Sequence, residues 1–257
     1  YDMYHKNLFH TKLIDMDIVS PEPYRVNEYF NQKCSIAQAF DILINKQGIR
    51  ELPKPTLVLS KEELLTARKA IDEIKEKTKK EKVVIVQPFG RAIKQIDNSF
   101  VDASNRSIEF FNLKNIIRKL MEKDFAVVLM SEFGIDFKDA GFPGEVALPE
   151  KVQLRQWAGM IKYADVFLGC DSVGQHLAYA VGTPANVVLG ATYPQNTSYP
   201  GVENFNIIDL GQMTREYDPI RISFDERISR KNETIMNMTP EIEDYVVSAV
   251  NGDPIEE

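Results

Sequence analysis

The sequence predicts an α/β protein built on a doubly wound parallel sheet. Between residues 83 and 189, short apolar runs alternate regularly with stretches of helical periodicity. The apolar runs are continuous and do not alternate with polar residues, as expected of strands whose two faces are both covered by helices. At 257 residues and 44% hydrophobic content, the chain is long enough for one large domain or two small ones.

The segment before this alternation carries helical signals that are interrupted by prolines. Residues 27–46 have apolar positions compatible with one or two helices, which end before Gly48. Residues 56–59 are then expected to form a short strand. Ser60, with Glu63 three residues later, is a capping box that begins a helix. The apolar face of this helix comprises Leu64, Ala67, Ile71 and Ile74.

The alternating region supplies the remaining strands and helices in order. Strands are expected at residues 83–87, 125–130, 166–169 and 186–189, with helices at residues 108–122, 152–163 and 174–181 between them. Close to the end of the chain, Pro240 occupies a favourable first helical position and begins a helix that runs to about residue 250. In a sheet of this kind, ligands bind beyond the carboxyl ends of the strands.

Charge and composition exclude several classes of function. The formal net charge of -7 argues against nucleic-acid binding, which requires clustered Lys and Arg. The longest apolar runs, such as residues 125–130, are far shorter than the roughly 20 residues of a membrane-spanning helix. Two cysteines, Cys34 and Cys170, are too few for a disulfide framework. We therefore expect free thiols, a cytoplasmic location, no transmembrane segment and no nucleic-acid partner.

The loop at residues 169–176 has the residue types of a diphosphate site. It leaves a strand, turns tightly and begins a helix, whose N-terminal amides and dipole attract an anion. Ser172 offers a hydroxyl donor, Gly174 lets a ligand approach the backbone, and His176 can donate to a phosphate oxygen. Asp171 can accept from sugar hydroxyls. The ordinary alternative is a turn in which Asp171 or Ser172 caps the helix and His176 lies in the core.

This loop and the residues after it resemble the family nine glycosyltransferases, typified by lipopolysaccharide heptosyltransferases. The family carries a D-[S/T]-G-x-x-H segment, an alanine-rich helix, G-T-P, a strand and a G-x-T-x-P loop. The present chain has the same order at matching distances, with residues 171–176, 182–184 and 190–194. It departs from the pattern at Val173, where the family has glycine, and the glycine lies one position later. The resemblance covers about residues 57–201.

The resemblance implies a GT-B fold, of which this chain is mainly the C-terminal, Rossmann-like half. Residues 1–52 would be a remnant of the N-terminal acceptor domain with its linker. Residues 53–238 would form the nucleotide-sugar-binding domain, and residues 239–257 a C-terminal helix and tail. The implied donor is a nucleotide-diphospho-sugar, with ADP favoured, and the implied acceptor is a glycan of the lipopolysaccharide type. Peripheral membrane association through the acceptor is compatible with this assignment, and neither a metal nor another cofactor is implied.

The resemblance also implies donor-binding residues in other loops. Arg106 stands near the place of a lysine that clamps the diphosphate in the family, and Arg91 is its alternative. A guanidinium binds phosphate oxygens in a bidentate way, so either replacement is chemically reasonable. Glu132 would accept from ribose hydroxyls, although a solvated glutamate is the ordinary alternative. The complete predicted set is Gly90, Arg91, Arg106, Glu132, Asp171, Ser172, Val173, Gly174, Gln175, His176 and Thr192.

Three other functions each share at least one feature with this sequence. The D-x-D triplet at residues 15–17 is of the kind that holds a divalent metal in GT-A glycosyltransferases, but it lies outside the alternating region. A nicotinamide-dependent dehydrogenase would need G-x-G-x-x-G after a strand, and no such motif occurs. A non-catalytic nucleotide-sugar-binding module is the main alternative, because nothing before Gly48 resembles the loop that carries the family's catalytic carboxylate. Since the chain begins with Tyr1, we expect that base on a preceding segment.

Overall fold

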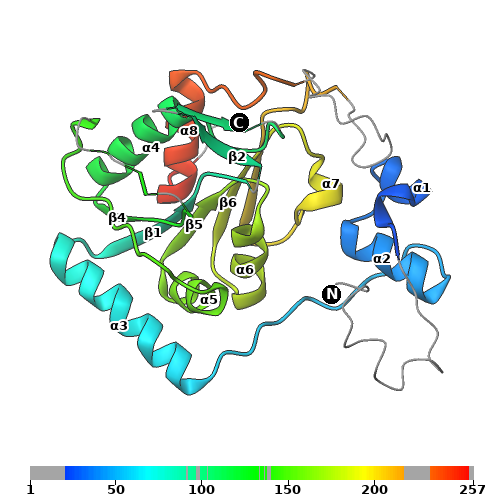
Figure 1. Cartoon of the computed structure of the whole chain (residues 1–257), viewed down its shortest axis with the longest axis horizontal. Helices are drawn as coiled ribbons and strands as arrows, with labels where there is room; N and C mark the ends of the chain where they lie inside the picture. Colours follow the sequence, from blue (N-terminus) through cyan, green and yellow to red (C-terminus); the bar gives the residue numbers. More distant parts are fainter. Residues whose placement is uncertain are drawn as a thin grey trace.

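The computed structural model describes residues 21–90, 92–96, 99–102, 104–132, 134–135, 137, 140–216 and 232–254. A sheet of five parallel strands runs through its centre, and helices cover both faces (Figure 1). The strand order is β4-β1-β5-β6-β7. The predicted doubly wound α/β fold is therefore confirmed.

The direction of winding reverses between two neighbouring strands of this sheet. The strands are β1 (Lys82–Gln87), β4 (Phe125–Leu129), β5 (Val166–Gly169), β6 (Ala185–Leu189) and β7 (Phe205–Asp209). From β1 the chain crosses to β4 on one side, and it then returns to β5 on the other side of β1. The chain after β1 leads to α4 in one helix layer, and the chain after β5 leads to α6 in the other. Open α/β sheets bind their ligands at such a point, beyond the carboxyl ends of the strands.

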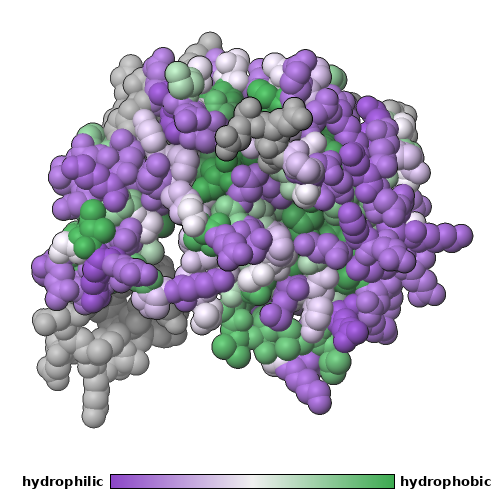
Figure 2. Space-filling view, turned by 180° about the vertical axis from the view of Figure 1, so that it is seen from behind, coloured by the Kyte–Doolittle hydropathy of each residue, from purple (hydrophilic) through white to green (hydrophobic). Residues whose placement is uncertain are grey.

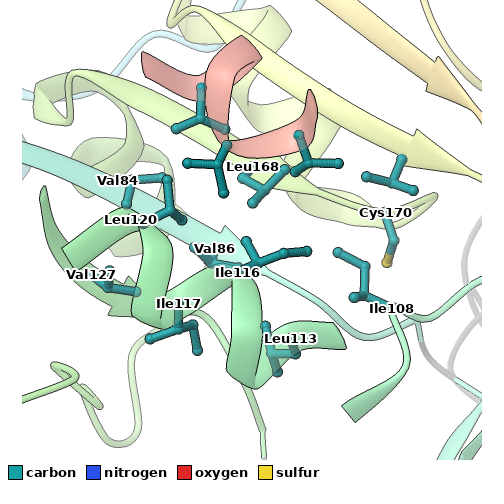
Figure 3. Close-up of a cluster of buried hydrophobic side chains, with 14 of the residues drawn as sticks. Val84, Val86, Ile108, Leu113, Ile116, Ile117, Leu120, Val127, Leu168 and Cys170 are labelled. Atoms are coloured by element: carbon teal, nitrogen blue, oxygen red, sulfur yellow. The ribbon is translucent and has the colours of Figure 1, made fainter. Parts of the chain in front are cut away.

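Two layers of helices enclose the sheet. One layer consists of α4 (Phe110–Glu122) and α8 (Pro240–Asn251), and the other of α3 (Lys61–Thr78), α5 (Leu154–Tyr163) and α6 (Val173–Val181). Successive β1 side chains point to opposite layers, so that Val84 and Val86 join α4 while Val83 and Ile85 join α5. Figure 3 shows the first of these two cores, in which side chains of α4 meet those of β1.

Helix α8 belongs to the same packed unit as the sheet. Its Val246, Val247 and Val250 are buried in the core formed with α4. The buried Glu243 accepts from the side-chain amides of Asn112 and Asn115 at 2.8 and 2.9 Å, and Lys119 lies 3.0 Å from its carboxylate. The structure thus joins α8 to the sheet domain, whereas the sequence analysis placed it in a separate C-terminal segment.

A small helical unit lies beside the sheet domain. It contains the 3-10 helix η3 (Pro23–Arg25), α1 (Asn27–Phe30) and α2 (Ile36–Asn45), which enclose Val26, Tyr29, Cys34 and Ala39. The unit lies near α7 (Pro194–Thr197), as Figure 1 shows. The buried side-chain amide of Asn196 in α7 donates to the carbonyl oxygens of Tyr29 and Cys34 at 3.1 and 2.8 Å. These two bonds join the unit to the loop that follows β6.

Two local predictions differ from the structure. Residues 56–59 form no strand and pair with no strand of the sheet. Leu57 and Leu59 instead pack against the core that contains buried residues of α3 and α5. The sequence analysis also passed over an antiparallel hairpin of β2 (Ile93–Ile96) and β3 (Ser99–Asp102). The hairpin extends the loop between β1 and α4, and it brings Asp102 to the carboxyl edge of the sheet.

Helices α3 and α5 make a close contact near their first turns. Ser60 and Glu63 form the predicted capping box, with the Ser60 amide 2.7 Å from the Glu63 carboxylate. Arg155 of α5 binds the same carboxylate at 2.5 Å, and this hydrogen bond holds the pKa of Glu63 at about 2. Further along, a Cβ added to Gly159 would lie 2.7 Å from the Cβ of Ala67. Glycine is therefore required where the two helices approach each other.

Replacing Gly159 with Ala should lower the free energy of unfolding by about 1–3 kcal/mol, because the added methyl group overfills a packed contact. The loss is expected even though alanine favours a helix over glycine by about 1 kcal/mol. Combining Gly159→Ala with Ala67→Gly should cost less than the sum of the two single changes, since the methyl group only moves between helices. Urea unfolding measures all three variants. Gly48→Ala is the control, because an added Cβ there meets no atom within 4 Å, and unchanged stability of Gly159→Ala would contradict this packing.

Candidate functional site

Three loops meet at the carboxyl edge of the sheet, where β1 and β5 lie side by side. Gln87 at the end of β1 is aligned with Gly169 at the end of β5. The loop after β1 is joined to the turn before α4, because the Gly90 amide donates to the Ser107 hydroxyl at 2.9 Å. A backbone bond of 2.8 Å between the Ile108 amide and the Pro88 carbonyl reinforces this junction. Gly90, one of the predicted residues, thus lies at the switch point.

Asp102 at the end of β3 organises the turn that carries Arg106. Its carboxylate accepts from the amide and the hydroxyl of Ser104 at 2.8 and 2.5 Å, and from those of Ser107 at 3.0 and 2.5 Å. Burial by itself would raise the pKa of Asp102, but these hydrogen bonds outweigh it and lower the pKa below its ordinary value. The carboxylate is therefore ionised at neutral pH. Sequence analysis missed Asp102, although an Asp two residues before a Ser is a common turn signal.

Arg106 extends from this turn toward Asp171. Its Nη1 atom lies 3.6 Å from Oδ2 of Asp171, and its Nε atom donates to the Ser104 hydroxyl at 3.1 Å. The Arg106 side chain is 28% exposed, whereas that of Asp171 is 8% exposed. A guanidinium has five N–H donors, so these two contacts leave donors that a ligand can reach from solvent.

The start of α6 is packed tightly against β1 and β5. The Gly174 amide donates to Oε1 of Gln87 at 2.7 Å, and a Cβ added to Gly174 would collide with that oxygen and with the Phe167 ring. This packing is one reason for a glycine at this position, and the close approach of a ligand to the Gly174 backbone stays a prediction. Ser172 forms the N-cap without a side-chain capping bond, and Val173 is exposed. These two residues are the outward-facing part of the helix start.

Gln175 supports Asp171 from the interior. The Gln175 side chain is fully buried, where its Nε2 atom donates to Asp171 at 3.2 Å and its Oε1 atom accepts from the Ser198 hydroxyl at 2.8 Å. A buried amide needs internal partners of this kind. The Gln175 side chain therefore points into the protein and fixes Asp171, and the contact of Gln175 with a nucleotide sugar stays a prediction.

His176 is held by an aromatic neighbour. Its Nδ1 atom lies 2.8 Å from the hydroxyl of Tyr199, and the two rings are edge to face. Burial lowers the pKa of His176, while the nearby charge of Asp171 offsets this in part. The imidazole is therefore neutral at pH 7 and carries a single N–H group.

The loop after β6 brings Thr192 to the same edge. The Ala191 amide donates to the Asn105 carbonyl at 3.4 Å, which joins this loop to the turn that carries Arg106. Thr192 is 8% exposed, and its hydroxyl has no hydrogen-bond partner among the residues that the structure describes. Buried hydroxyl groups almost always have a partner. Thr192 therefore stays a predicted ligand contact.

Arg215 holds the loop that contains Thr192 by a hydrogen bond to its backbone. Its side chain is 5% exposed, forms an ion pair with Asp209, and donates to the Gly190 carbonyl at 2.6 Å. Its guanidinium also lies 4.7 Å from the centre of the Tyr193 ring. Sequence analysis did not single out Arg215, because no local pattern links it to a loop more than twenty residues earlier.

Two of the predicted residues are not joined to this cluster. Glu132 follows β4 at the same edge of the sheet and is exposed, and within the described part of the chain no hydrogen bond or ion pair connects it to Arg106 or Asp171. Arg91 lies outside the described residues, as does the triplet at residues 15–17. The structure therefore gathers Arg106, Asp171 and His176 near Thr192, and it leaves the ribose assignment of Glu132 as a prediction.

Seen from behind, the molecule is largely hydrophilic, with a hydrophobic area at its lower edge (Figure 2). No helix among the described residues is long and apolar enough to span a membrane. The same residues contain no group of three or more His, Cys, Asp or Glu side chains that could hold a metal ion. Cys34 and Cys170 are free and buried, and burial raises the pKa of both thiols.

Residues 113–217 match the model of glycosyltransferase family 9 (heptosyltransferase). This chain shares the fold of a solved heptosyltransferase. The matched segment contains β5, α6 and the loops with Asp171, His176 and Thr192, so the resemblance predicted from the sequence is confirmed.

Solved heptosyltransferases share this fold. Escherichia coli ADP-heptose lipopolysaccharide heptosyltransferase II is 15% identical, with a TM-score of 0.52, over 84% of this chain and 62% of its own. The dodecameric iron-containing heptosyltransferase TibC of enterotoxigenic E. coli, solved in complex with ADP-D-β-D-heptose, is 13% identical, with a TM-score of 0.50, over 86% of this chain and 54% of its own. The chain thus spans less than two thirds of either enzyme. No curated protein matches the sequence.

Replacing Asp102 with Asn should lower the free energy of unfolding by about 1–3 kcal/mol at pH 7, because an amide cannot accept all the bonds donated by Ser104 and Ser107. The pKa of Asp102 is lowered in the folded state, so its stabilisation is present above the unfolded-state pKa of about 4 and is lost as the pH falls below that value. The difference between the parent and Asp102→Asn should therefore shrink in acid. Urea unfolding between pH 7 and pH 3 measures it, with the exposed Asp72→Asn as control. A difference that does not vary with pH would contradict this role.

Proposed function

We propose that this chain is the donor-binding part of a glycosyltransferase, and that the loops after β1, β5 and β6 bind the diphosphate of a nucleotide-diphospho-sugar. The observation that carries the proposal is the convergence of four groups at one edge of the sheet. They are the guanidinium of Arg106, the neutral imidazole of His176, the start of α6 and the unpaired hydroxyl of Thr192. Each can donate to, or attract, a phosphate oxygen.

The charges at this edge suit such a ligand. Asp171 would repel a diphosphate if its charge were not balanced, and Arg106 at 3.6 Å supplies the balancing charge. Because that separation is longer than a hydrogen bond, the guanidinium can turn toward phosphate oxygens without losing a strong contact. We assign to Asp171 the role of accepting from sugar hydroxyls, with Gln175 holding its carboxylate in place.

The reaction that we propose is an inverting transfer. TibC was solved with an ADP-heptose, which favours an ADP-sugar as the donor here. The name of the E. coli ADP-heptose lipopolysaccharide heptosyltransferase II favours a lipopolysaccharide-type glycan as the acceptor. The acceptor hydroxyl attacks the anomeric carbon, the bond from that carbon to the diphosphate oxygen breaks, and a general base takes the hydroxyl proton. Arg106, His176 and the start of α6 stabilise the charge that develops on the departing diphosphate.

The general base is the group that this arrangement leaves unassigned. Asp171 is engaged by Gln175 and Arg106, and Asp102 by two serines, so neither carboxylate is available to take the proton of an acceptor hydroxyl. We propose that the base lies on a segment that is not among the 257 residues of this chain. The 257-residue chain should then bind a nucleoside diphosphate and transfer no sugar. Robust transfer by this chain would contradict that assignment and would require a base among the residues present.

Replacing Arg106 or His176 with Ala should weaken the binding of ADP by about 1.5–3 kcal/mol, the usual scale of a hydrogen bond to a charged group. The binding of adenosine should hardly change, because both side chains are assigned to the diphosphate. Glu132→Ala should weaken ADP and adenosine alike, since its assigned partner is the ribose. Isothermal calorimetry with ADP, UDP, GDP and adenosine measures each case.

The exposed Arg68 of α3 provides a matched control for these measurements, and Arg68→Ala should leave all affinities unchanged. Absence of binding by all three nucleoside diphosphates would overturn the proposed site. If Arg106→Ala has no effect while Arg91→Ala abolishes binding, the diphosphate clamp belongs to the residues directly after β1 and not to the turn before α4.

Replacing Thr192 with Val should affect stability and binding in opposite directions. Valine has the same shape and removes a buried hydroxyl without a partner, so the free energy of unfolding should stay the same or rise. The affinity for ADP should fall, because the ligand loses a hydrogen-bond partner. Urea unfolding and calorimetry on the same preparation test both effects, and the exposed Thr214→Val is the control for the change of residue type. A more stable variant with full ADP affinity would remove Thr192 from the site.

A further inference from the structure

Tyr199 lies at the centre of an aromatic cluster beside His176. Its ring stacks on Tyr179 with ring centres 3.8 Å apart, and it meets Phe205 edge to face at 5.2 Å. The Tyr179 ring in turn has the Lys54 ammonium 4.7 Å from its centre. Aromatic contacts on several sides restrict the rotation of the Tyr199 ring. The Tyr199 hydroxyl therefore stays at a fixed place, 2.8 Å from Nδ1 of His176.

The direction of the bond between Tyr199 and His176 decides which nitrogen of the imidazole carries the proton. A neutral imidazole has one N–H group, and the other nitrogen accepts. Burial and the neighbouring Tyr179 raise the pKa of Tyr199 to about 12, so the phenol keeps its proton at neutral pH. Within the described part of the chain, the acceptor in contact with that proton is Nδ1 of His176. This arrangement favours a bond in which the phenol donates and Nδ1 accepts.

We propose that Tyr199 is a positioning residue, which donates its phenolic proton to Nδ1 and thereby holds His176 in the tautomer that carries its proton on Nε2. The consequence rests on the proposed function: Nε2 then presents an N–H donor to the leaving diphosphate. Such a donor is set before the ligand arrives, because the surrounding rings hold both partners in place. In this way a residue 23 positions away from His176 along the chain controls its hydrogen-bonding role.

The tautomer can be measured in the ligand-free protein by nitrogen-15 NMR of the histidine side chains. The chain has three histidines, and a His176→Gln variant identifies the signals of His176. In the parent we expect Nε2 to be protonated and Nδ1 to be an unprotonated acceptor. In Tyr199→Phe we expect a mixture of the two tautomers. A parent protein with the proton on Nδ1 would overturn the proposal, whether or not any nucleotide binds.

Binding measurements test the consequence separately. Tyr199→Phe should weaken ADP about 2- to 10-fold, the scale of one ordinary hydrogen bond, and should leave adenosine unchanged. In the His176→Gln background, Tyr199→Phe should have no further effect on ADP. Tyr179→Phe is the matched control, since it keeps the stacked ring but removes a hydroxyl that does not contact His176, and it should change neither tautomer nor affinity.

The outcomes separate this proposal from the proposed function. If ADP does not bind to the parent, the donor site is wrong, while the NMR result still decides the tautomer. If ADP binds and Tyr199→Phe changes only the free energy of unfolding, Tyr199 is merely structural and the proposal is overturned. Loss of ADP affinity together with a mixed tautomer supports it.

Discussion

A single hydrogen bond links the first strand of the sheet to the helix that carries the candidate site. The Gly174 amide at the start of α6 donates to Gln87 at the end of β1, and the Phe167 ring of β5 fills the space where a side chain would otherwise lie. The contact is possible because position 174 has no Cβ, and it sets the distance of α6 from the switch point. Asp171 and His176 lie on either side of this contact, so their positions depend on it.

Two carboxylates flank a site for which we propose an anionic ligand, and each of them has partners in the structure. Four hydrogen bonds from two serines stabilise the charge of Asp102. Arg106 balances Asp171, which Gln175 also holds from within. His176 stays neutral because it is buried, and it therefore acts as a directed donor and not as a charge. The Arg106 guanidinium thus supplies positive charge at this edge.

The loop after β6 is anchored at several points that are far apart in the sequence. The turn before α4 holds it through the Asn105 carbonyl, Arg215 holds the Gly190 carbonyl, and Asn196 binds the helical unit at Tyr29 and Cys34. Rigid anchoring of this kind lets the Thr192 hydroxyl remain buried without a partner among the described residues. The stability of the fold elsewhere has to offset that unfavourable burial.

The sequence by itself determined the features that depend on local periodicity and on short motifs. Continuous apolar runs identified β1, β4, β5 and β6, because strands covered on both faces have no polar alternation. The capping box located the start of α3, and the motif around Asp171 indicated the resemblance to family nine glycosyltransferases. The strand β7 escaped this reasoning, since Asn206 and Asp209 interrupt its apolar run. The strand expected at residues 56–59 was wrong, because apolar residues can equally pack against helices.

Only the tertiary structure decided what each residue of the motif does. Gly174 and Gln175 belong to the matched segment, yet their neighbours are Gln87, Phe167 and Ser198, which arrive from other strands and loops. Asp102 and Tyr199 were missed for the same reason, since their importance comes from partners brought to them by the fold. A local pattern specifies backbone conformation and burial, whereas a hydrogen bond between distant segments depends on how the whole chain packs.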